Sequence, residues 1–198
     1  MGKIVVWGMA AVMCAGVSWA DAAPVTVKGD KIALTFGSEE KGAVVSLKTA
    51  AGVELAAAGK MAQRLFSLSF SQQAQPPGEL FTLSSLDAAA FSADGKEEAG
   101  GTTATLTYAG FTQGVEQVVC TVRTRSDDAR ARWGIAVRMR DGWVLEKVQY
   151  PCVTLAAPLG TSVEDDAAVV GSAKGGVFRK PGAMKTGFST SISQPGPL

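Results

Sequence analysis

Two long stretches in which apolar and polar residues alternate, 115–125 and 130–140, constrain the fold more than any other feature of the sequence. Alternating side chains occupy opposite faces of a β-strand, so each stretch is expected to be a strand with one buried face. The segment between them, Ser126-Asp127-Asp128-Ala129, has the length and composition of a hairpin loop. The stretches are roughly twice as long as an ordinary strand, which predicts a large, curved antiparallel sheet.

Most of the remaining chain also has the pattern of strands separated by turns. Residues 31–36, 65–70 and 102–108 alternate in polarity or are rich in β-branched residues. A polar, glycine-rich connection is expected at 94–101, and no segment has the period of an amphipathic helix. The predicted fold is therefore all-β, a large antiparallel β-sandwich. Residues 194–198 carry turn residues without a closing strand, which favours a sandwich that is incomplete at its C-terminus.

Residues 1–23 have the features of a cleavable secretory signal peptide. Lys3 supplies the positive charge, residues 4–17 form an apolar stretch, and the small residues at 18–22 satisfy the cleavage rule. The apolar stretch is shorter than the about 20 residues that a membrane-spanning helix needs. We therefore expect a secreted or periplasmic protein with one mature β-sandwich domain, residues 24–198, and no membrane contact after cleavage.

The charge of the chain predicts no partner. It has 19 basic and 18 acidic residues, so it has no overall field that would attract nucleic acid or an anionic membrane. Most of its arginines nevertheless lie in the predicted hairpin and share one face of it: Arg123, Arg125, Arg130, Arg132, Arg138 and Arg140. Two interpretations remain open, a solvated face neutralised by acids of a neighbouring strand, or a surface that binds an acidic glycan or a docking domain.

The chain contains no histidine, which excludes Ser-His-Asp and Cys-His nucleophiles and histidine metal ligands. Glycoside hydrolysis needs only two carboxyl groups, but neighbouring residues of a strand point to opposite faces. The pairs Glu39-Glu40, Glu97-Glu98 and Asp127-Asp128 are therefore poor candidates. Glu164-Asp165-Asp166 admits a calcium site or, more simply, a turn that contacts Arg or Lys. We predict no catalytic residue, no cofactor and no metal site.

Four further residues of the mature chain are candidates for specific roles. Cys120 and Cys152 are the two cysteines of the mature chain, an even number that suits a disulfide in an oxidising compartment. Both lie in apolar runs, where a free thiol can equally be buried as a small hydrophobic residue. Trp133 and Trp143 are either platforms for sugar stacking or aromatic residues of the core. The sequence leaves both choices open.

The order of several segments resembles the N-terminal part of bacterial glycoside-hydrolase-like proteins, which begin with a galactose-mutarotase-like β-supersandwich. The segments are Ile32-Ala33-Leu34-Thr35-Phe36, Val45-Ser46-Leu47, Gly52-Val53-Glu54-Leu55, Leu65-Phe66-Ser67-Leu68, Trp143, Val148-Gln149-Tyr150-Pro151, Pro158-Leu159-Gly160, Glu164-Asp165-Asp166 and Gly175-Gly176. The resemblance implies a TIM-type barrel that follows the sandwich and carries the hydrolytic carboxylates, and it implies that this chain is the front part of a larger enzyme. Mutarotases use a histidine, so this chain is not expected to run that reaction.

These observations predict a non-catalytic N-terminal β-sandwich domain of an exported carbohydrate-active enzyme, with a catalytic barrel as its expected partner. The alternative is a stand-alone secreted module that binds carbohydrate or mediates adhesion. A third interpretation is a structural domain that binds nothing.

Overall fold

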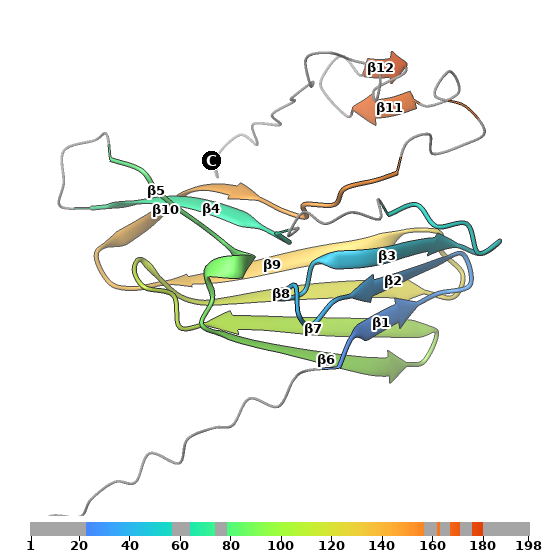
Figure 1. The fold of residues 1–198 in the computed structure, drawn as a ribbon, viewed down its shortest axis with the longest axis horizontal. Helices are drawn as coiled ribbons and strands as arrows, with labels where there is room; N and C mark the ends of the chain where they lie inside the picture. The colour runs from blue at the N-terminus through green and yellow to red at the C-terminus, as the bar shows by residue number, and fades with distance from the viewer. Residues whose placement is uncertain are drawn as a thin grey trace, which may run out of the picture.

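A computed structural model describes residues 23–56, 64–73, 79–156, 162, 167–170 and 176–179 (Figure 1). The signal-peptide prediction, residues Glu164-Asp165-Asp166 and the C-terminal turn residues therefore lie outside the described residues. The described elements are strands β1 (Val25–Lys28), β2 (Ile32–Phe36), β3 (Val44–Thr49), β4 (Ser67–Gln72), β5 (Phe81–Ser84), β6 (Ala90–Glu98), β7 (Gly101–Ala109), β8 (Val115–Arg125), β9 (Ala131–Met139), β10 (Trp143–Gln149), β11 (Ala167–Val170) and β12 (Gly176–Arg179), and a short 3-10 helix, η1 (Ser85–Asp87).

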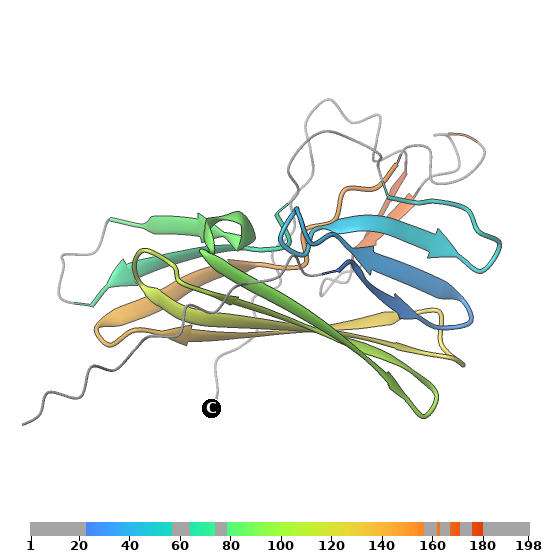
Figure 2. The ribbon, with the colours of Figure 1, turned by 60° about the horizontal axis from the view of Figure 1, so that its bottom comes forward.

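Strands β1 to β10 form antiparallel sheets in two layers, and β11 pairs with β12 in a separate two-stranded sheet. One layer is the four-stranded sheet β6-β7-β8-β9. The other consists of two three-stranded sheets, β1-β2-β3 and β10-β4-β5, which lie side by side over the same face of the four-stranded sheet (Figure 1). Figure 2 shows the strong twist of the four-stranded sheet. The prediction of an all-β antiparallel sandwich is confirmed.

The predicted hairpin is confirmed as the pair β8–β9. β8 spans 115–125 as expected, whereas β9 begins and ends one residue inside the predicted stretch. Cys120 pairs with Ile135, and Arg123 lies directly opposite Arg132. β7 pairs with β8 along its other side, so β8 is an interior strand of the four-stranded sheet.

Residues 94–98 are a correction to the sequence analysis. They were expected in a connection but form the second half of β6, which pairs with β7 from Ala90 to Glu98. All five residues are exposed, so they show no alternation of buried and exposed positions that would mark them as a strand. Their conformation comes from pairing with β7, whose own inner residues are buried.

The core lies between the two layers. Inward-facing residues of β7 and β8 are fully buried: Ala104, Leu106, Tyr108, Val118, Cys120 and Val122. They pack against buried residues of the other layer, among them Leu34, Phe36, Leu68 and Phe70. The ring of Phe66 meets Tyr108 edge-on with 4.9 Å between centroids, which joins the layers in the middle of the molecule.

Candidate functional site

Trp143, the first residue of β10, belongs to an aromatic cluster. Its indole meets Phe70 of β4 at 5.4 Å and Phe81 of β5 at 5.3 Å between ring centroids, both edge-on. β10 pairs with β4 and β4 with β5, so the three rings come from adjacent strands. Trp143 is half-buried, so only part of the indole is available to a ligand.

Trp133, the other candidate for sugar contact, lies on β9 and faces the core. Its indole meets Phe36 of β2 and Tyr150 at 5.9 Å between centroids in each case, again edge-on. It is also half-buried. The two tryptophans share no ring partner, so the structure does not join them into one aromatic platform.

Cys120 and Cys152 are free thiols in the structure rather than a disulfide. Cys120 is buried in β8, and this burial raises the pKa of its thiol to about 12, with the nearby Tyr150 hydroxyl acting in the opposite direction. Burial likewise raises the pKa values of Tyr108 and Tyr150. Cys152 is only partly buried, and its Sγ lies 3.8 Å from the carbonyl oxygen of Gln149. A thiol with a raised pKa is a poor nucleophile, so Cys120 acts as a small core residue.

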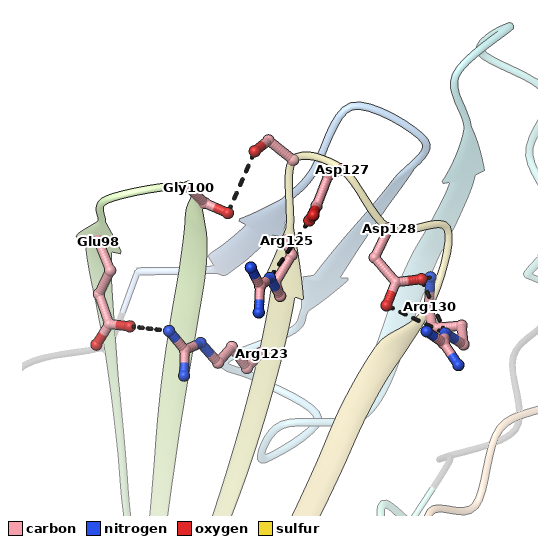
Figure 3. A network of polar contacts seen from close by, with 8 residues as sticks. Glu98, Gly100, Arg123, Arg125, Asp127, Asp128 and Arg130 are labelled. Atoms are coloured by element: carbon pink, nitrogen blue, oxygen red, sulfur yellow. Dashed lines mark hydrogen bonds and ion pairs between the residues drawn. The ribbon is translucent and has the colours of Figure 1, made fainter.

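The arginine-rich face of the β8–β9 hairpin is largely neutralised by acids (Figure 3). The ion pairs are Arg123–Glu98 at 3.2 Å, Arg125–Asp127 at 3.3 Å, Arg130–Asp128 at 2.9 Å and Arg138–Glu116 at 2.9 Å. Arg140 donates to the carbonyl oxygen of Phe111 at 2.8 Å. The hydrogen bond from Arg130 holds the pKa of Asp128 below its usual value. Arg132 has no hydrogen-bond or ion-pair partner among the described residues.

Three members of the acid pairs named in the sequence analysis are partners for these arginines. Glu98, Asp127 and Asp128 each bind a different guanidinium. Glu54 has a structural role, since its carboxylate accepts hydrogen bonds from the Ser46 hydroxyl and from backbone N–H groups at Leu47 and Ala56. The bond from Ser46 is the main reason that the pKa of Glu54 is lowered.

A small cavity of about 180 Å³ lies beside the aromatic cluster. Its lining residues come from β4, β5, η1 and the loop after β7: Phe70, Thr82, Leu83, Asp87, Phe111, Thr112 and Gln113. It is smaller than the about 300 to 1,000 Å³ of an ordinary small-molecule pocket. The sequence analysis missed these residues, because segments that are distant in the chain form the cavity and none of them carries a recognisable motif.

Within the described ranges, no group of three or more Cys, Asp and Glu side chains has the arrangement of a metal site. The same part of the chain contains no helix long and apolar enough to cross a membrane. Comparison of the sequence with protein-family models and curated proteins, and of the fold with solved structures, found no match.

Proposed function

We propose that the chain is a non-catalytic β-sandwich domain of an exported carbohydrate-active enzyme and that it supports a catalytic barrel in the full-length protein. The architecture carries this proposal. An all-β fold with antiparallel sheets in two layers is the fold class that the resemblance to galactose-mutarotase-like β-supersandwich domains implies.

The use of the carboxylates supports the non-catalytic part of the proposal. A glycosidase needs a carboxylic acid with a raised pKa to protonate the leaving group, opposite a second carboxylate. Glu54 and Asp128 have lowered pKa values instead, since hydrogen bonds stabilise their charged forms. Glu98 and Glu116 are held by arginines on the outer surface.

The reading frame of the gene tests the domain assignment directly. We expect it to continue past the codon for Leu198 into a TIM-type barrel that carries paired carboxylates. A stop codon at that position would overturn the assignment and leave the stand-alone module as the better explanation.

A carbohydrate-binding module is the second candidate, and the surroundings of Trp143 favour it. The indole contacts Phe70, which also lines the small cavity. Thr82, Asp87 and Gln113 add hydroxyl, carboxylate and amide groups to the lining, the usual partners of sugar hydroxyls.

A glycan array with Trp143→Leu and Trp133→Leu separates the two candidates. Leucine keeps apolar volume but lacks a flat ring for stacking. Saturable retention that is lost in Trp143→Leu and kept in Trp133→Leu would establish the binding module. Absence of retention by the folded wild-type protein would remove it.

A further inference from the structure

The edge of β9 that faces away from β8 is unpaired within the part of the chain that the structure describes. The sheet order β6-β7-β8-β9 places β9 at the end of the longer sheet. After the turn at Arg140–Gly142 the chain leaves β9, and β10 pairs with β4 in the other layer. No strand within the described residues pairs with β9 on the side away from β8. Along this strand of nine residues, the backbone N–H and C=O groups on that side have no partner strand among the described elements and suit pairing with another chain.

The burial of side chains falls sharply at this edge. On β8 the inward-facing Val118, Cys120 and Val122 have no exposed surface. Their neighbours on β9, Val137, Ile135 and Trp133, are only half-buried. A further strand beside β9 would cover this apolar row and complete the core on that side.

The opposite edge of the sheet differs in composition. β6 carries Asp94, Lys96, Glu97 and Glu98, so charged side chains point to both of its faces. Charges on both faces of an edge strand discourage pairing with another strand. β9 has charges on its outer face only, so its inner face remains able to pack against an apolar strand.

The charges on β9 indicate which kind of strand could pair with its unpaired edge. Its outer face carries Arg132 and Arg138, separated by Gly134 and Ala136. Antiparallel pairing with β9 of a second copy, centred on Ile135, would place Arg132 of each chain opposite Arg138 of the other. Like charges directly opposite each other destabilise a sheet, so a second copy is a poor occupant. An acidic side chain fits beside Arg132, which has no ion-pair partner among the described residues, whereas Arg138 already binds Glu116.

We propose that the open edge of β9 binds an extended segment of a partner polypeptide by strand addition. The segment carries apolar residues on the face toward the core and acidic residues on the outer face. Main-chain hydrogen bonds provide affinity, while the apolar row and the unpaired Arg132 select the sequence. This inference does not depend on the proposed carbohydrate role.

Synthetic peptides test the proposal on the purified mature protein. The probe is a labelled peptide with valines at inward positions, threonines at outward positions, and two glutamates six positions apart, the spacing of Arg132 and Arg138. A second peptide carries lysines in place of the glutamates, and a third has N-methylated backbone amides. We expect saturable binding of the first peptide, measured by fluorescence anisotropy, and no binding of the other two. Failure of the first peptide to bind, or equal binding of the N-methylated one, would overturn strand addition.

Charge reversal on β9 identifies the edge. In Arg132→Glu/Arg138→Glu, binding of the acidic peptide is expected to weaken at least about tenfold, and the lysine peptide should now bind. Lys96→Glu on β6 is the control and should leave the affinity unchanged. Unchanged affinity in the double variant, or an equal loss in the control, would show that the peptide binds elsewhere and would overturn the proposal.

Discussion

Gly114, in the loop before β8, shows how a single residue fixes the position of an aromatic ring. Its φ angle of +70° lies in the left-handed region, and a Cβ atom at this position would overlap the ring of Phe70. Glycine is therefore required both by the backbone and by the space available.

Replacing Gly114 by alanine is expected to destabilise the protein more than the same change at Gly142. Gly142 has a similar φ of +78° but open space around its Cα, so Gly142→Ala measures the backbone strain alone. The additional overlap should make Gly114→Ala lower the free energy of unfolding by about 1 to 3 kcal/mol more. Urea unfolding measures both variants, and equal losses would contradict the packing described for Phe70.

Glu54 makes the stability of the protein depend on pH. Its pKa in the folded protein is below the reference value of 4.5, so its contribution is fully present above about that pH and is lost as the pH falls through the lowered value. Glu54→Gln should therefore unfold with a weaker pH dependence in the acidic range than the wild type. Chemical unfolding at several pH values measures this, and parallel curves for the two proteins would contradict the role of its hydrogen bonds.

The two thiols should differ in reactivity. Cys120 is buried with a raised pKa, whereas Cys152 is partly exposed. An alkylating reagent is expected to modify Cys152 first in the native protein, and both thiols after unfolding without a reductant. Mass spectrometry of the alkylated protein shows which of the two cysteines has been modified. If neither cysteine reacts in the unfolded, unreduced protein, the pair is a disulfide and the assignment of free thiols is incorrect.

Strands whose residues alternate between core and solvent were predictable, while others were not. β8 was predicted because buried residues alternate with more exposed ones from Val118 to Arg125, although a bulge near Val115 interrupts the pattern at its start. The second half of β6 was not, because its exposed, charged residues lack this signal and its pairing partner determines its conformation. The roles of Trp133 and Trp143 could not be deduced either, since the ring contacts that half-bury them come from distant strands.

The open edge of β9 gives a prediction that uses the protein alone. Arg132→Glu converts antiparallel self-pairing of β9 from two like-charge contacts into two attractive ones, each between the introduced glutamate of one copy and Arg138 of the other. We expect this variant to form dimers at concentrations at which the wild type is monomeric. Arg132→Glu/Arg138→Glu restores like charges and should be monomeric. Light scattering after size-exclusion chromatography measures the mass, and a monomeric Arg132→Glu variant would contradict the assigned edge.

The whole molecule combines a packed core, incompletely covered at β9, with surfaces that suit support and docking. Its buried residues fill the space between the long sheet and the two smaller sheets. Its acidic side chains with identified partners bind arginines, serine hydroxyls or backbone groups. An architecture of this kind suits the proposed role of a domain that positions other parts of a protein, and the proposal assigns hydrolytic chemistry to a barrel outside this chain.

Hydrolysis of a panel of aryl glycosides tests most directly whether the sandwich itself is non-catalytic. The purified sandwich, residues 24–198, and the longer, barrel-containing protein that the proposal expects are assayed side by side for release of the aryl alcohol. The proposal predicts release by the longer protein and none above background by the sandwich. Release by the sandwich alone, lost when its carboxylates are replaced, would contradict the account.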